Sequence, residues 1–204
     1  MPNDLIQRTF KEWTDGVGAC AARIAVFDRV REIPYGYPAS RDPVEVLQQG
    51  RGSCSGKHSL LAEMYRLLGL RVRHMICTHR FNESSLVFPP PMQEMLRRNE
   101  IIDFHDYLQI AVDDQWIDVD ATWQCGLREF GFPVNEGWDG KSAMLLSVVP
   151  EEFAVAERDP ERLKEELLSK LTPRQRMLRK QFLEALSGWV EDLGAEIRRD
   201  SDRA

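Results

Sequence analysis

Residues 105–122 constrain the fold of this chain more than any other stretch, because they read as two β-strands joined by a tight turn. Apolar and polar residues alternate over 105–112 and again over 115–122, and only Asp113-Asp114 separates the two runs. A two-residue turn fixes which residues face each other, so we expect Val112 to pair with Gln115 and His105 to lie opposite Thr122. The fold must therefore contain an antiparallel sheet.

The same register sorts the side chains of this hairpin onto two faces. The core face carries Leu108, Ile110, Val112, Ile117, Val119 and Ala121, and the other carries His105, Tyr107, Gln109, Trp116, Asp118, Asp120 and Thr122. On that second face His105 and Asp120 are diagonal neighbours whose side chains can meet. They form a candidate base and orienting carboxylate. The ordinary alternatives are a structural histidine and a solvated aspartate.

A second constraint comes from residues 50–69, where a stretch rich in glycine and serine runs into apolar residues at helical spacing. This pattern predicts a helix that starts near Cys54. At a helix N-terminus the unpaired N–H groups and the positive end of the dipole favour a thiolate, the nucleophilic form of cysteine. The alternative, a small buried apolar cysteine, fits less well with a setting of glycine and serine.

Other stretches predict the elements around these two features. Helical spacing over residues 5–31 predicts one amphipathic helix, or two broken near Gly16 and Gly18. Asp42 and Gly50 are placed to cap and stop a short helix between them. Residues 70–80 and 143–149 predict strands.

Two further segments frame the C-terminal half. Residues 81–103 contain three consecutive prolines and a short helix over 92–99, which predicts an excursion that could cover a site. The tail from residue 159 predicts helix, with Thr172 as a cap and an apolar stripe made of Met177, Phe182, Leu183, Leu186, Trp189, Val190, Leu193 and Ile197. We expect this helix to pack on the domain or on a second copy of the chain, as a homodimer would.

Composition limits the class of protein. The 204 residues, 43% hydrophobic and 29% charged, are typical of a globular chain with one main domain, and no apolar run reaches the length of a membrane span. The N-terminal residues do not resemble a secretory signal, so we expect a cytoplasmic protein. The net charge of -6 disfavours nucleic acid as a partner. Four widely spaced cysteines disfavour a disulfide framework.

Two other site types fit the sequence less well. Cys54 and His58 stand four residues apart, and His74, Cys77 and His79 follow, but strand alternation would put His74 on the face opposite the other two. We therefore predict no metal and no other cofactor. Residues 50–58 also look like a phosphate-binding loop, yet they lack the glycine and the Ser or Thr that such a loop needs at Arg51 and His58.

Together, these residues resemble the transglutaminase-like superfamily, a branch of the papain-type cysteine enzymes. The resemblance rests on Gly52-Ser53-Cys54 opening a helix, on His105 opening a strand, and on the run from Trp116 to Asp120-Ala121-Thr122, and it covers about residues 40–125. It departs from the usual pattern after the histidine, where Asp106 and Tyr107 replace a small residue and Trp. No calcium-binding acidic loop is evident.

The resemblance implies an α+β fold in which the cysteine helix packs on an antiparallel sheet. With the helical tail, we expect a transglutaminase-like domain over 1–155 and a C-terminal helical extension over 156–204. The resemblance also implies Cys54 as the nucleophile, His105 as the general acid and base, and Asp120 as the residue that orients His105. Oxyanion or substrate contacts are assigned to Gln48, Ser53, Tyr107 and Trp116.

The activity that the resemblance implies is attack of a thiolate on an amide, followed by a thioester intermediate. Water would then give a peptidase, amidase or deamidase, and an amine would give transglutaminase-type acyl transfer. We expect hydrolysis of a peptide, protein or small amide, because nothing in the sequence marks a site for a second amine. The competing hypothesis is a protein-binding domain that keeps the fold without catalysis, and no membrane partner is expected.

Overall fold

The computed structural model describes residues 2–156 and 159–201, with the side chains of 4–156 and 159–199. Its four strands are β1 (Val72–Arg80), β2 (Ile102–Val112), β3 (Gln115–Val119) and β4 (Phe153–Ala156). Its helices are α1 (Pro2–Thr14), α2 (Ala19–Arg31), α3 (Pro43–Gln49), α4 (Cys54–Leu67), α5 (Pro90–Arg98), α6 (Pro160–Ser169) and α7 (Pro173–Ser201). The predicted mixture of helices with an antiparallel sheet is confirmed.

The strands form one antiparallel sheet in the order β3-β2-β1-β4. Val112 pairs with Gln115 and Leu108 with Val119, so the predicted hairpin register is confirmed over residues 108–112. The predicted pairing of His105 with Thr122 is wrong, because β3 ends at Val119. Asp113 and Asp114 both have positive φ, 49° and 62°, as a type I′ turn requires. Because β3 pairs only with residues 108–112 of β2, the stretch of β2 around His105 is left open to the chain that follows β3.

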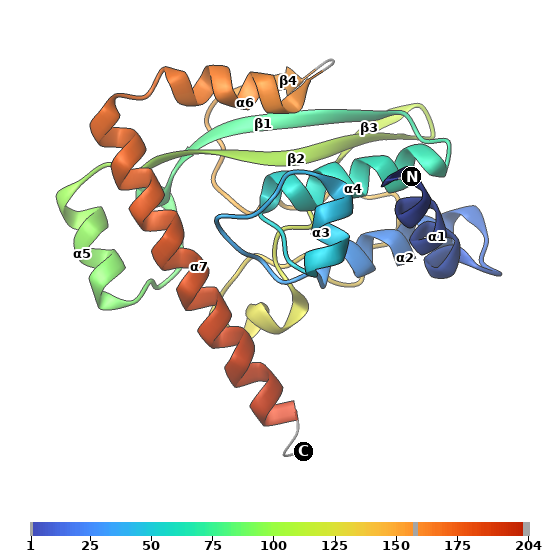
Figure 1. Cartoon of the computed structure of the whole chain (residues 1–204), viewed down its shortest axis with the longest axis horizontal. Coiled ribbons are helices and arrows are strands. Elements are labelled where there is room, and N and C mark those ends of the chain that lie inside the picture. The colour runs from blue at the N-terminus through green and yellow to red at the C-terminus, as the bar shows by residue number, and fades with distance from the viewer. Residues whose placement is uncertain (1, 157–158, 202–204) are drawn as a thin grey trace.

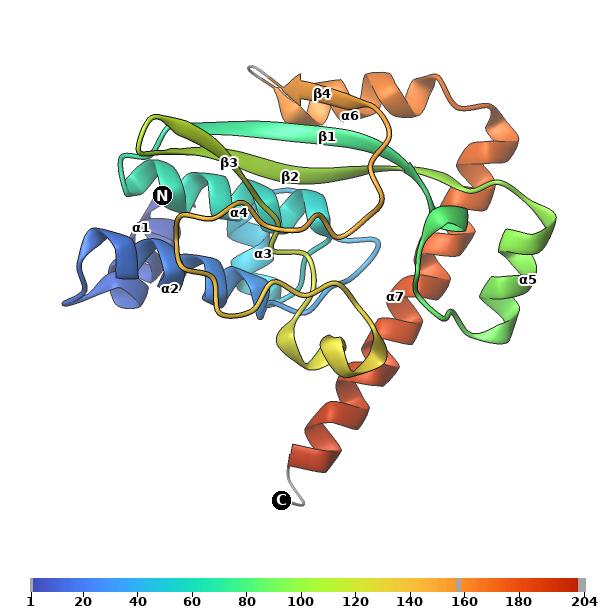
Figure 2. The ribbon, with the colours of Figure 1, turned by 180° about the vertical axis from the view of Figure 1, so that it is seen from behind.

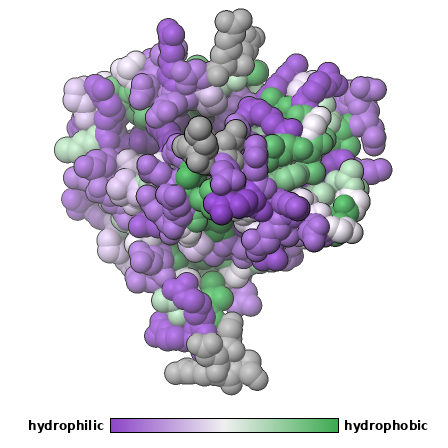
Figure 3. Space-filling model, turned by 45° about the vertical axis from the view of Figure 1, so that its right-hand side comes forward, coloured by the Kyte–Doolittle hydropathy of each residue, from purple (hydrophilic) through white to green (hydrophobic). Residues whose placement is uncertain are grey.

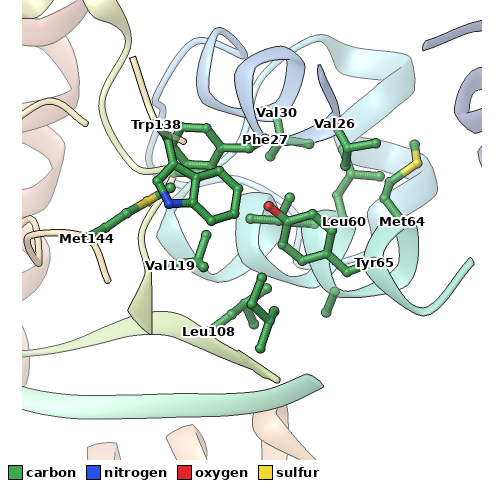
Figure 4. Packing of buried hydrophobic residues seen from close by; sticks show 14 of the residues in the cluster. Val26, Phe27, Val30, Leu60, Met64, Tyr65, Leu108, Val119, Trp138 and Met144 are labelled. Atoms are coloured by element: carbon green, nitrogen blue, oxygen red, sulfur yellow. The ribbon is translucent and has the colours of Figure 1, made fainter. Parts of the chain in front are cut away.

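Helix α4 lies against β2 and β1, and α1, α2 and α3 lie on the far side of it from the sheet (Figures 1 and 2). The main hydrophobic core fills the space between α2, α4, β2 and β3. Figure 4 shows this core, in which the rings of Phe27 and Trp138 are 5.3 Å apart. Val26, Phe27, Val30, Leu60, Met64, Tyr65, Leu108 and Val119 are all fully buried. This core holds α4 in place against the sheet.

The helix ends follow the predicted capping signals. The Asp42 side chain accepts hydrogen bonds from the backbone N–H groups of Val44 (2.7 Å) and Glu45 (3.1 Å), and Gly50 ends α3 in a left-handed conformation with φ 60°. Thr172 caps α7 through its bond with Gln175. The break between α1 and α2 falls at Gly16 and Gly18, as predicted.

The two C-terminal helices pack against the rest of the chain. Leu163, Leu167 and Leu168 of α6 contact Ile76 and Phe104 of the sheet. Helix α7 crosses the end of the sheet, and its far end projects away from the body (Figure 1). Its apolar stripe contacts the excursion 81–103, whose buried members there are Phe81, Phe88, Met92 and Ile101. One predicted member of the stripe, Met177, is instead about half exposed (52%).

The predicted strand at 143–149 is wrong, since the last strand is β4, which pairs with β1. The N–H groups of residues 143–149 bind elsewhere. Met144 N–H donates to Asp118 O (2.9 Å), Leu145 N–H to Asn135 Oδ1 (3.2 Å), and Ser147 N–H to Asp120 Oδ2 (2.7 Å). Because two of these three N–H groups bind side chains, the segment does not form a strand ladder.

Hydrophilic side chains predominate on the face of the molecule drawn in Figure 3. No helix among residues 2–156 and 159–201 is long and apolar enough to cross a membrane.

Candidate active site

Cys54 is the first residue of α4, and Ser53 is its N-cap, as the sequence predicts. The loop that delivers Cys54 is held by the connector before α3, because Gly36 N–H donates to Gly52 O (3.1 Å) and Gly52 N–H donates to Pro34 O (3.0 Å). Gly56 lies so close to the backbone of Ser40 that a Cβ there would collide with it. The glycines therefore let the first turn of α4 approach the preceding loop closely.

Two buried side chains fix the start of α4 to the chain that follows β3. Lys57 donates to the carbonyl oxygens of Arg31, Ile33 and Thr122, each at 2.8 Å. His58 lies 2.8 Å from Cys54 O through Nδ1, and its Nε2 accepts the N–H of Ala121 at 3.0 Å. Since Nε2 accepts, the ring is neutral with its proton on Nδ1. These bonds place Cys54 next to the chain that carries Asp120.

His105 and Asp120 form a buried pair, with His105 Nε2 at 2.8 Å from Asp120 Oδ2. Asp120 Oδ2 also accepts the N–H of Ser147, and Oδ1 accepts the N–H (3.0 Å) and hydroxyl (2.6 Å) of Thr122. Burial alone would raise the pKa of Asp120, but His105, His58 and the Thr122 hydroxyl hold it well below its ordinary value. Asp120 is therefore a carboxylate that fixes the orientation of the His105 ring.

The Cys54 thiol is half-buried and has His105 as a hydrogen-bond partner. Burial alone would raise the pKa of Cys54, but the Lys164 ammonium and the bond to His105 outweigh it and lower the pKa. Burial alone would lower the pKa of His105, yet Asp120 and Cys54 raise it well above its usual value. Both directions favour a thiolate beside an imidazolium, with Nε2 engaged by Asp120 and Nδ1 left for the sulfur.

A second buried cluster also reaches Cys54. Asp106, the neighbour of His105 on β2, accepts a hydrogen bond from Ser55 Oγ at 2.8 Å and forms an ion pair with Lys164 of α6. Lys164 Nζ lies 2.9 Å from Ser55 Oγ and 3.9 Å from Cys54 Sγ, and Asp106 Oδ2 lies 3.8 Å from the same sulfur. Two members of this cluster, Asp106 and Lys164, therefore contact the sulfur of Cys54. Lys164 belongs to α6, and Asp106 leaves β2 on the face opposite His105.

A cleft of about 180 Å³ opens at Cys54. The connector 33–38, the start of α4 and helices α6 and α7 all contribute to its walls. Its lining includes Tyr35, Tyr37, Arg41, Ser53, Asp103, Lys164, Leu168, Arg179 and Leu183. Arg179 Nε binds Asp103 Oδ1 at 2.6 Å, which ties α7 to β2 at the edge of the cleft.

The structure brings only some of the predicted contact residues to this cleft. Ser53 lines it. Gln48 is exposed on α3 and is not among the lining residues. Tyr107 lies on the same face of β2 as His105, but it is buried with Met75 and Cys77 and does not line the cleft. Trp116 pairs with Ala111 near the hairpin turn, about 20 Å along β2 from His105.

Four residues that contact the site are not predicted from the sequence: Ser55, Asp106, Ser147 and Lys164. Asp106 carried a weak signal, since it departs from the superfamily pattern directly after the histidine. Lys164 carried none, because it lies 110 positions after Cys54 in a helix full of charged residues. In the described part of the chain, no three His, Cys, Asp or Glu side chains are grouped so that they could hold a metal ion.

The fold and this cluster define an α+β protein with a cysteine at a helix N-terminus beside a buried histidine–aspartate pair. A model of the transglutaminase-like superfamily matches residues 8–121, more than half of the 204 residues. The chain therefore belongs to the transglutaminase-like superfamily.

Comparison with solved structures gives two similar chains. One, from Cytophaga hutchinsonii and described as "a Putative Cysteine Protease", is 16% identical with a TM-score of 0.44 and covers 78% of this chain and 53% of its own. Another, described as a TGase, is 12% identical with a TM-score of 0.44 and covers 89% of this chain and 48% of its own. The present chain thus spans about half the length of each. Among curated proteins, nothing matches.

Proposed function

We propose that this protein is a cysteine hydrolase that cleaves an amide bond through a thioester, with Cys54 as nucleophile, His105 as acid and base, and Asp120 as the group that orients His105. One observation carries the proposal: the His105–Asp120 pair, at 2.8 Å, lies beside a thiol that opens a helix. A nucleophile, a base and an orienting carboxylate are the three parts that this chemistry needs.

In the first half of the proposed reaction, the Cys54 proton rests on His105 and the thiolate attacks the amide carbonyl. A C–S bond forms, and the carbonyl electron pair moves onto oxygen. The N–H of Cys54 is suited to stabilise this oxyanion, because the first N–H groups of a helix have no partner within it. When the oxyanion collapses, the C–N bond breaks and His105 donates its proton to the leaving amine.

In the second half, water attacks the thioester while His105 removes its proton. The acid leaves, and the sulfur recovers its electron pair. If an amine replaces water at this step, the product is a new amide, as in transglutaminase-type transfer. Both outcomes pass through the same thioester and differ in the product that it gives, whereas a domain without catalysis forms no thioester. One experiment that follows both the thioester and the product therefore distinguishes all three.

The test is to incubate the protein with a panel of peptides and small amides and to follow acyl adducts by intact mass, with and without an added primary amine. We expect an acyl adduct on the wild type. The adduct should be absent from Cys54→Ala, and it should form no faster in His105→Ala than in the wild type. Cys20→Ala is the matched control, because Cys20 is exposed and outside the cleft. Turnover that persists in Cys54→Ala, or the absence of any adduct or product across the panel, would contradict the proposal.

A further inference from the structure

We propose that Lys164 is a further residue of the catalytic site and stabilises the Cys54 thiolate by direct contact, from the side of β2 opposite His105. This inference rests on the proposed function only in taking Cys54 as the nucleophile. The sulfur would then lie between two cations, each with its own carboxylate: His105 with Asp120, and Lys164 with Asp106.

The contacts of the Lys164 ammonium account for its three protons. Asp106 Oδ2, Ser55 Oγ at 2.9 Å and Cys54 Sγ at 3.9 Å are its partners, and an ammonium has three N–H donors and no acceptor. Ser55 in turn donates its own hydroxyl proton to Asp106 (2.8 Å). With two donors satisfied by oxygen atoms, the remaining one is free to point at the sulfur.

Strand geometry explains why the two cations reach Cys54 from different sides. His105 and Asp106 are consecutive residues of β2, so their side chains leave opposite faces of the strand. Asp106 shares its face with Leu108 and Ile110, which pack on α4, whereas Tyr107 shares the face of His105. Because Lys164 is bound to Asp106, its ammonium approaches the sulfur from the α4 side.

Burial makes this contact an electrostatic one. The side chain of Lys164 is 3% exposed and that of Asp106 is 2% exposed, so water screens their charges little. Burial alone would lower the pKa of Lys164, but Asp106 and Cys54 raise it, so the amine carries its proton.

Other charged or titratable groups also act on Cys54, so the effect of Lys164 has to be separated from theirs. His105 and Lys164 favour the thiolate, and Asp106 opposes it. Groups on neighbouring elements whose own pKa values respond to Cys54 are Tyr35, Lys57, Cys77 and Arg179. His58 lies one turn along α4 and is held neutral by its bond to Ala121. Among these groups, Lys164 and His105 are the two that do most to lower the pKa of Cys54.

If Lys164 stabilises the thiolate, the site needs the C-terminal part of the chain. Lys164 belongs to α6, beyond residues 8–121 that match the superfamily. The cation beside the sulfur is therefore supplied by a helix outside the matched region.

The experiment measures the rate at which iodoacetamide alkylates Cys54 as a function of pH, with peptide mass spectrometry to separate Cys54 from the other cysteines. The variants are Lys164→Met, Lys164→Arg, and the double variant Lys164→Met with Asp106→Asn. The measured quantity is the midpoint, the pH at which Cys54 is alkylated at half its maximal rate. We expect this midpoint to rise by about one pH unit in Lys164→Met, which is a tenfold loss of thiolate at pH values below both midpoints. Lys164→Arg, which keeps the positive charge, should retain a midpoint near that of the wild type.

The double variant keeps the test valid if Lys164→Met alone is unstable, because it leaves no buried charge without a partner. Its midpoint should lie between those of the wild type and Lys164→Met, since Asp106 opposes the thiolate. Cys20 in the same samples reports any change in reagent or folding. An unchanged midpoint in the folded variants would overturn the proposal, and so would a failure of both Met variants to fold, which would assign Lys164 a structural role.

Alkylation needs no turnover, so its result is independent of the proposed function. A thiolate that depends on Lys164 in a protein without amidase activity would uphold this inference and refute the other. Amide turnover together with an alkylation midpoint that is unchanged in Lys164→Met would support the proposed function and refute this inference.

Discussion

His58 offers a prediction whose size can be worked out from the structure. It is fully buried, accepts the N–H of Ala121 at 3.0 Å and lies 2.8 Å from the carbonyl oxygen of Cys54. His58→Phe removes both of these hydrogen bonds and leaves the buried N–H of Ala121 without an acceptor. A buried donor without a partner costs about 1–3 kcal/mol, so the variant should lose about that much stability at pH 7.

The same residue predicts how stability depends on pH. Burial lowers the pKa of His58 to about 4, whereas a histidine in an unfolded chain titrates near 6.5. Between these values the unfolded state binds more protons, so stability rises with pH. The contribution of His58 is complete above pH 6.5 and is lost as the pH falls toward 4. Between pH 7 and pH 5 this loss amounts to about 2 kcal/mol.

Urea unfolding at pH 7 and pH 5 measures both effects. His58→Phe should be less stable than the wild type at pH 7, but it should lose about 2 kcal/mol less than the wild type between pH 7 and pH 5. His58→Gln is the control, because an amide can both donate and accept but does not titrate; it should cost less at pH 7 and share the weaker pH dependence. His74, whose pKa burial also lowers to about 4, keeps part of the acid sensitivity in every variant. Equal pH dependence in wild type and His58→Phe would refute the reasoning.

Three further predictions concern other parts of the chain. Asp120→Asn removes the charge that raises the pKa of His105, so alkylation of Cys54 at pH 6 should slow by about tenfold or more, as measured with iodoacetamide. Asp42→Ala removes a cap that accepts two backbone N–H groups and should cost about 1 kcal/mol in urea unfolding. Phe27→Ala opens a cavity beside Trp138 in the main core and should cost about 3–5 kcal/mol in the same assay, and a cost below about 1 kcal/mol would contradict the described packing.

The sequence predicted the parts of the candidate site that depend on local pattern. The start of α4 is predicted because the chain changes, near Cys54, from a stretch rich in glycine and serine to an apolar stripe at helical spacing. The meeting of His105 and Asp120 follows from a two-residue turn, which fixes the register of the hairpin. Each of these conclusions needs fewer than about 20 consecutive residues, a range over which periodicity and turn chemistry determine the geometry.

The rest of the site depends on contacts between distant segments, for which the sequence carries no local signal. Lys164 stands in an amphipathic helix with other charged residues, and nothing in its neighbours marks it as buried. The spacing of His58 from Cys54 is also compatible with a metal ligand, but the partners of His58 are backbone groups. Residues 143–149 have the composition of a strand, yet their N–H groups bind Asp118, Asn135 and Asp120.

The central claim is that Cys54 is held as a reactive thiolate, and the most direct test is to compare its alkylation with that of Cys20 in the wild-type protein at pH 6. Cys20 is exposed and Cys54 is half-buried, so access alone would favour Cys20. The account predicts that iodoacetamide labels Cys54 first, because the thiolate is the reacting form. Labelling of Cys20 ahead of Cys54 in the folded protein would contradict the account.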